Sequence, residues 1–132
     1  MKAKNDKPTN EEQIRRLVNN WAKAIRARDM EGALAYHAKD VVMFDVPLPL
    51  QSKGIEAYKM TWNLFFDSNP GGKGSFELRE LKITAGDTVA FCHALLITRG
   101  GKEPQGRLTI GLKKSRENWM IVHEHHSYPI KD

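Results

Sequence analysis

The sequence is poor in cysteine and has no long apolar segment. Its single cysteine, Cys92, has no partner for an internal disulfide, which agrees with a reducing compartment and excludes a cysteine-based zinc finger. No apolar run approaches the roughly 20 residues that cross a bilayer, and the opening MKAKNDKPTN lacks the apolar segment of a secretory signal. These absences predict a soluble, cytoplasmic protein.

A basic stripe is also absent, although the formal net charge is +5. Lysine and arginine are scattered over the tail, the first helical segment and the turns, without the interleaved aromatics typical of nucleic-acid binding. We therefore expect no nucleic-acid partner and no membrane partner. The 132 residues suffice for one domain, which we place at 10–130 behind a disordered tail at 1–9.

Helical periodicity is confined to the first half of the chain. The segment TNEEQIRRLVNNWAKAIRARD carries apolar residues at helical spacing, and Asn10 with Gln13 is placed as a capping pair. Asp29 is expected to cap a short second helix, MEGALAYHA. A third helix is expected at about 55–67, ending before SNPGGKG.

The remainder has the pattern of strands. VVMFDV alternates and is β-branched, and four long segments follow: SFELRELKIT, DTVAFCHALLITR, QGRLTIGLKKS and NWMIVHEHHSYP. Short polar connections between the four suit antiparallel hairpins. This order predicts an α+β domain with helices on one face of a curved sheet. Several strands are apolar on both faces, so we expect another subunit to cover the second face in a homodimer.

Two long segments carry a family resemblance. WAKAIRARDMEGALAYHAKDVVMFD and the closing GRLTIGLKKSRENWMIVHEHHSYP resemble the nuclear transport factor 2-like superfamily, and the ending resembles its SnoaL-like members. The resemblance implies a cone-shaped, cystatin-like fold, in which three N-terminal helices pack on a curved, mainly antiparallel sheet. It also implies a conical hydrophobic pocket between sheet and helices.

The resemblance implies candidate site residues too. Asp45 falls where ketosteroid isomerase holds its general-base aspartate. Trp21 and Thr109 fall where that enzyme has its two oxyanion donors, and both are weaker or differently directed donors than its tyrosine and protonated aspartate. Steroid isomerisation itself is therefore not the expected reaction.

Strand alternation divides the run HEHH into two sets. The resemblance directs Glu124 and His126 into the cavity, and His123 and His125 onto the outer face at the subunit interface. It also directs the preceding two strands inward at alternate positions. The resulting catalytic candidates are Asp45, His126 and Arg107, and the substrate-binding candidates are Trp21, Tyr58, Trp62, His93, Leu95, Thr109 and Glu124.

Each of these residues also has a purely structural interpretation. Asp45 could accept local hydrogen bonds or pair with Arg107, and Glu124 could form a buried ion pair with Arg107. The aromatics at helical spacing could be core. His123 and His125 form an H-x-H pair, but a metal centre needs a third ligand that is not evident on that face, so we expect no metal and no cofactor.

Two functions remain open at this level. One is a small-molecule-binding enzyme of the isomerase, cyclase or dehydratase type, in which Asp45 or His126 moves a proton on a small hydrophobic carbonyl compound without a cofactor. The other is a non-catalytic ligand-binding or dimerisation module of the same fold.

Overall fold

The computed structural model describes residues 7–130, so residues 1–6 of the predicted tail lie outside the described part. In chain order the elements are α1 (Asn10–Arg26), α2 (Met30–Leu34), β1 (His37–Phe44), β2 (Ser52–Lys53), α3 (Ile55–Ser68), β3 (Phe76–Ala85), β4 (Val89–Thr98), β5 (Gly106–Ser115) and β6 (Asn118–Ser127). The predicted α+β class is confirmed. None of the helices in this range is long and apolar enough to cross a membrane.

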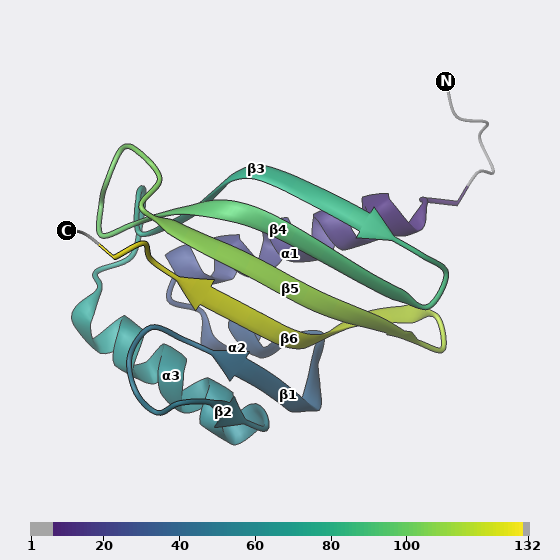
Figure 1. Cartoon of the computed structure of the whole chain (residues 1–132), viewed down its shortest axis with the longest axis horizontal. Helices are drawn as coiled ribbons and strands as arrows, with labels where there is room; N and C mark the ends of the chain where they lie inside the picture. The colour runs from purple at the N-terminus through teal and green to yellow at the C-terminus, as the bar shows by residue number, and fades with distance from the viewer. Residues whose placement is uncertain (1–6, 131–132) are drawn as a thin grey trace.

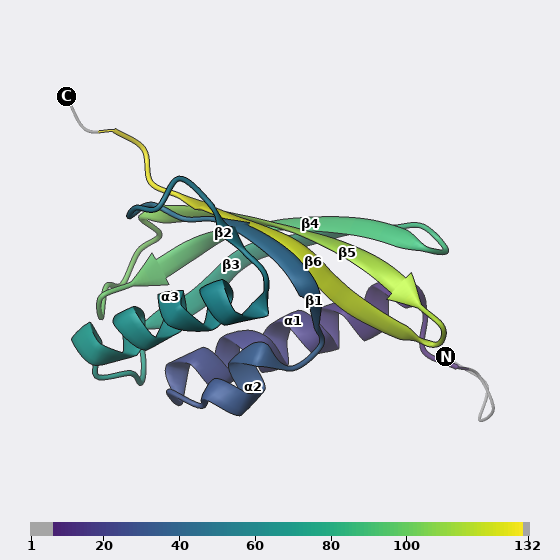
Figure 2. The same cartoon turned by 90° about the horizontal axis from the view of Figure 1, so that it is seen from below.

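The strands form one curved sheet in the order β2-β1-β6-β5-β4-β3 (Figure 1). β1 runs parallel to β6, and all other neighbouring strands are antiparallel. Figure 2 shows the three helices together beneath one face of this sheet, while no helix formed by residues 7–130 covers the opposite face. The sheet therefore has an inner face, toward the helices, and an outer face.

The start of α1 differs by one residue from the expectation. Thr9, not Asn10, is the N-cap, and it forms a capping box with Glu12. Asn10 instead joins the helix to the sheet, because its Oδ1 accepts hydrogen bonds from Lys114 Nζ at 3.1 Å and Trp119 Nε1 at 3.2 Å.

The second helix is shorter than expected. Asp29 caps it as predicted, accepting a hydrogen bond from the Gly32 amide. The helix then ends at Leu34, Tyr36 takes a left-handed conformation with φ of 57°, and β1 begins at His37. The predicted helical state of residues 35–38 is therefore wrong, and His37 lies on a strand of the sheet.

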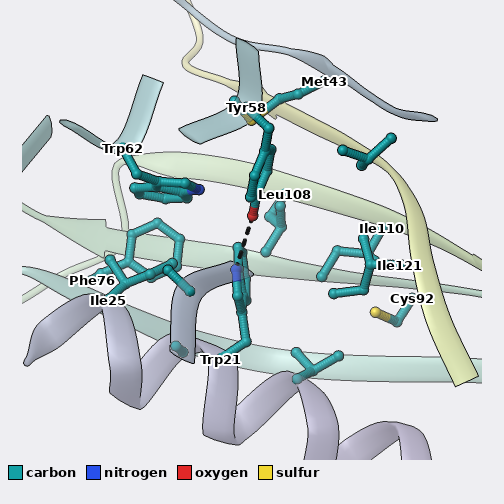
Figure 3. Packing of buried hydrophobic residues seen from close by; sticks show 14 of the residues in the cluster. Trp21, Ile25, Met43, Tyr58, Trp62, Phe76, Cys92, Leu108, Ile110 and Ile121 are labelled. Carbon is teal, nitrogen blue, oxygen red and sulfur yellow. Dashed lines mark hydrogen bonds between the residues drawn. The ribbon is translucent and has the colours of Figure 1, made fainter. Parts of the chain in front are cut away.

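The core lies between the helices and the inner face. Figure 3 shows its aromatic centre, where Trp21 from α1 and Tyr58 and Trp62 from α3 meet Phe76 from β3. All four side chains are buried. The space in which the resemblance implies a conical cavity is thus filled largely by aromatic rings.

Two hollows of the described range lie elsewhere. One, of about 660 Å³, is a groove between the C-terminal half of α1 and β3, lined by Lys23, Arg26 and Leu78 among others. The other, of about 340 Å³, lies beside α1 and α2. Neither is lined by Glu124 or His126.

Candidate functional site

Strand β6 carries the polar centre of the inner face. Its pairing with β5 shifts register between Gly111 and Leu112, which leaves Val122 as an extra residue, a β-bulge. Ile121 before the bulge and Glu124 after it both have no exposed surface. Because the bulge changes the alternation, Ile121 lies on the inner face together with Glu124 and His126, which point inward as expected.

The Glu124 carboxylate is the hub of a buried hydrogen-bond network. Tyr58 donates its hydroxyl to Oε2 over 2.6 Å, and Nε2 of His37 lies 2.7 Å from the same oxygen. The second oxygen, Oε1, lies 3.0 Å from Nε2 of His126. The side chains of Glu124 and His37 are both fully buried.

His37 is the member of this network that the sequence did not reveal. It was expected in a helix, so its side chain was not assigned to any site. The parallel register between β1 and β6 sets Met43 beside Glu124, and the buried His37 begins the same strand. The β-branched pair Val41 and Val42 indicated the strand itself, but no local signal extended that strand back to His37.

Indole groups extend the network toward the helices. Trp21 donates its Nε1–H to the Tyr58 hydroxyl over 3.0 Å (Figure 3). The indole N–H of Trp62 points toward the Tyr58 hydroxyl and acts to lower the pKa of that phenol, but the two groups do not reach hydrogen-bonding geometry, and Trp62 Nε1 is the one buried side-chain nitrogen or oxygen in residues 7–130 without a partner. A buried N–H without an acceptor is costly.

The electrostatics of the network favour an anionic glutamate and a neutral tyrosine. Burial alone raises the pKa of Glu124, but hydrogen bonds and charge from His126 and His37 lower that pKa to about 2. Burial raises the pKa of Tyr58 well above its ordinary value, and the Glu124 carboxylate raises it further. The phenol therefore stays a donor to the carboxylate.

His126 lies at the edge of this network with an aromatic wall around it. Its ring centroid lies 6.4 Å from that of Trp21, 6.1 Å from that of Trp62 and 6.2 Å from that of Phe76. Of its side-chain surface, 9% is exposed to solvent. Nε2 is held by Glu124, and Nδ1 has no hydrogen-bond partner within residues 7–130.

The predicted inward orientation of His93, Leu95, Arg107 and Thr109 is wrong. Directly paired residues of an antiparallel sheet share a face. Leu108 pairs with His126 on the inner face, so Thr109, which pairs with His93 and His125, lies on the outer face. Leu95 pairs with Arg107 on that same outer face, and Arg107 donates to Ser127 Oγ. The structure therefore does not bring Arg107 to Glu124.

Asp45 follows the end of β1 and is half-buried. Its carboxylate accepts a hydrogen bond from the backbone amide of the next residue, Val46, at 2.7 Å. This is the local hydrogen bonding that its structural interpretation anticipates. No hydrogen bond within residues 7–130 joins Asp45 to Glu124, His126 or Arg107.

His123 and His125 lie on the outer face, where they were expected. The Phe44 ring contacts both, with centroid distances of 4.8 and 5.4 Å. Nδ1 of His123 donates to the Val42 carbonyl over 2.7 Å, which occupies that nitrogen. In the described range no group of three or more histidine, cysteine, aspartate or glutamate side chains is arranged to hold a metal ion.

Residues 14–131 match the model of a SnoaL-like domain. The chain belongs to the SnoaL-like domain family. No protein of curated function matches the sequence significantly.

Solved structures agree with this SnoaL-like assignment. A nuclear transport factor 2-like protein of unknown function from Pseudomonas putida is 32% identical, with a TM-score of 0.79 over 92% of this chain and 87% of that chain. A ketosteroid isomerase-like protein from Erwinia carotovora atroseptica has a TM-score of 0.71 at 18% identity, covering 93% and 100% of the two chains. A nuclear transport factor 2-like protein with a cystatin-like fold from Novosphingobium aromaticivorans has a TM-score of 0.68 at 15% identity, covering 90% and 81%. The expected superfamily and cystatin-like fold are confirmed.

Within residues 7–130, His126 is an interior side chain with one oriented and one unpartnered ring nitrogen. In His126, one nitrogen is oriented by a buried carboxylate and the other is free. An imidazole held in this way can accept a proton at the free nitrogen, while the carboxylate stabilises the cation that forms.

Proposed function

We propose that this SnoaL-like domain binds a small hydrophobic carbonyl compound beside His126 and moves a proton on it. The observation that carries the proposal is the 3.0 Å contact between His126 Nε2 and the buried carboxylate of Glu124, beside an aromatic wall. Proton abstraction next to a carbonyl group is the common step of isomerase, cyclase and dehydratase chemistry, and it needs one positioned base.

His126 supplies the base in this account. Its Nδ1 takes the proton, and the resulting positive charge is stabilised by Glu124 through Nε2–H. The exposed 9% of the His126 side chain marks where a ligand reaches the ring. Because aromatic rings fill the surrounding interior, binding requires some of them to shift, and a flat apolar ligand can replace their contacts.

Trp62 supplies the hydrogen-bond donor to the carbonyl oxygen of the ligand. A carbonyl oxygen gains negative charge when the adjacent carbon loses its proton, and a preorganised N–H near that oxygen stabilises the charge. The indole N–H of Trp62 is buried without an acceptor, and its ring contacts that of His126. A ligand oxygen accepting from this N–H would satisfy the unpaired donor.

Asp45 is the competing candidate for the base, supported by its place in the resemblance and by its half-buried position after β1. The geometry supports Asp45 less well than His126, because the Asp45 carboxylate accepts only a local hydrogen bond from Val46. Arg107 lies on the outer face, so within one subunit it is a poor candidate for stabilising charge at His126.

The proposal can be tested without knowing the final product. In D2O, a base that abstracts a proton next to a carbonyl group exchanges that proton for deuterium, which proton NMR detects. We expect the protein to accelerate exchange on at least one member of a panel of cyclic and aryl ketones. His126→Gln should lower that rate by about 100-fold or more, in the range of a lost general base.

The variants Asp45→Asn and Trp62→Phe complete the experiment. Asp45→Asn should keep the wild-type rate, while Trp62→Phe should lower it by about tenfold or more through loss of the donor. Loss of exchange in Asp45→Asn with retention in His126→Gln would transfer the role of base to Asp45. A wild-type protein without exchange on any ketone would contradict the proposed activity.

A second candidate function is a dimerisation module without catalysis. The uncovered outer face exposes Phe44, Val89 and Phe91 by 36%, 56% and 49% of their surfaces. Exposed apolar side chains on an uncovered sheet face favour an interface with another subunit. This function and proton transfer use opposite faces of the sheet, so they are compatible.

A further inference from the structure

The Glu124 carboxylate lies between two imidazole rings that differ in what else they contact. His37 is fully buried against one carboxylate oxygen, and His126 is held at the other. The protons on these two rings decide whether His126 has a free lone pair. The number of oxygen acceptors that each ring faces indicates how many protons it carries.

Both ring nitrogens of His37 face oxygen acceptors. Nε2 lies 2.7 Å from Glu124 Oε2, and Nδ1 lies 2.9 Å from the backbone carbonyl oxygen of Ala35. A carbonyl oxygen and a carboxylate can only accept. A neutral imidazole has one N–H, so in either tautomer it would direct a lone pair against one of these oxygens. Only the doubly protonated ring donates to both.

His126 meets a single acceptor. Its Nε2 faces Glu124 Oε1 at 3.0 Å, and Nδ1 has no partner among residues 7–130. One N–H on Nε2 therefore satisfies this ring, and Nδ1 keeps its lone pair. A second proton, on Nδ1, would add a charge beside the aromatic wall without adding a hydrogen bond within the protein.

The charge balance of the interior agrees with one cation. Glu124 contributes a single negative charge, since its pKa lies at about 2, and Tyr58 is a neutral phenol because its pKa is raised. Cys92 on β4 is also neutral, since burial and Glu124 raise the pKa of its thiol to about 12. In the described range no other titratable side chain is hydrogen-bonded to the carboxylate. A single imidazolium therefore neutralises the site.

We propose that His37 is a positioning residue that carries the positive charge paired with Glu124 and so keeps His126 in its neutral Nε2–H form, with Nδ1 free. The role of His126 as the base rests on the proposed function, but the placement of the protons does not. Without the charge of His37, the buried carboxylate would draw a second proton onto His126 and block the base.

The placement of protons can be read directly from imidazole nitrogens. In 15N-labelled protein at neutral pH, two-bond 1H–15N correlation spectra distinguish protonated from unprotonated ring nitrogens. We expect both nitrogens of His37 to be protonated and only Nε2 of His126 to be protonated. An unprotonated nitrogen on His37, or a doubly protonated His126, would overturn the proposal in the wild-type protein alone.

The variant His37→Gln separates charge from hydrogen bonding. The glutamine amide can still donate to Glu124 but brings no positive charge. We expect His126 to become doubly protonated, and any exchange activity to fall by about tenfold or more at neutral pH and to return as the pH is raised. His93→Gln on the outer face should change neither the His126 spectrum nor the activity.

The outcomes separate this inference from the proposed function. The expected spectra together with no exchange activity would leave the proton placement intact and contradict only the proposed function. Exchange activity that depends on His126, together with a His126 spectrum that is unchanged in His37→Gln, would support the proposed function and contradict the role of His37. If His37→Gln does not fold, the wild-type spectrum still decides the placement.

Discussion

The carboxylate of Glu124 is fully buried and is held as an anion by its neighbours. Its folded-state pKa of about 2 lies below its ordinary value of 4.5. The stabilisation that follows is therefore complete above about pH 4.5 and is lost as the pH falls from there toward 2.

Acid titration of stability tests this charge. The difference between 4.5 and about 2 corresponds to on the order of 3 kcal/mol. We expect Glu124→Gln to be less stable than wild type at pH 7 in urea unfolding, because His37 loses its anionic partner. The variant should lose less stability than wild type between pH 7 and pH 3. Equal losses in the two proteins would show that Glu124 is not ionised in the fold.

Cys92 provides a second prediction for a single residue. Its thiol is fully buried on the inner face, and burial followed by the nearby Glu124 carboxylate raises its pKa to about 12. Because the thiolate is the reactive form, the native thiol should react with iodoacetamide at pH 8 at least about 100-fold more slowly than in urea. Comparable rates would mean that the core around β4 opens freely.

Among the elements, α1 illustrates how local sequence determines a boundary. The capping box of Thr9 and Glu12 satisfies backbone donors in its first turn. Sequence alone located the start of this helix to within one residue, because both Thr9 and Asn10 are good caps. The structure distinguishes them through the long-range contacts of Asn10 with Lys114 and Trp119.

Replacement of the cap tests this assignment. Thr9→Ala should lower the free energy of unfolding by about 1 kcal/mol, the usual effect of losing a side-chain cap. Thr9→Ser keeps the hydroxyl and should stay within about 0.5 kcal/mol of wild type. Urea denaturation followed by circular dichroism measures both. A neutral Thr9→Ala variant would show that the capping box does not contribute to stability.

For the strands, the sequence predicted less reliably which residues face inward. On β5, Leu108 and Ile110 alternate with Arg107 and Thr109, and this local pattern correctly indicates an apolar inner face. The family resemblance instead implied that Arg107 and Thr109 face inward, which is one residue out of step with the observed alternation. The bulge at Val122 has no local sequence signal, yet it determines which β6 residues share a face.

The sequence predicted the candidate site only in part. Glu124, His126, Tyr58 and the two tryptophans come from elements whose pattern is clear, and the structure brings them together. His37 was missed because its position depends on where β1 begins after the turn at Tyr36. Helix and strand propensities differ too little over such a short segment to locate that start.

For the whole molecule, the uncovered outer face leads to a prediction about assembly. We expect the protein to sediment as a homodimer joined through this face, because Phe91 and Val89 would otherwise remain about half exposed. Phe91→Asp should weaken the dimer by about 100-fold or more. Leu64→Asp, at an exposed apolar position on α3 in the helical layer, should leave it intact. A wild-type monomer at high protein concentration would contradict the predicted interface.

The most direct test of the account compares two adjacent histidines of β6 in the deuterium-exchange assay. His125 is exposed on the outer face, and His126 is buried against Glu124 on the inner face. We expect His126→Gln to lower the exchange rate on a responsive ketone by about 100-fold or more and His125→Gln to change it by less than about twofold. Equal effects of the two substitutions, or a larger effect of His125→Gln, would contradict the assignment of His126 as the base.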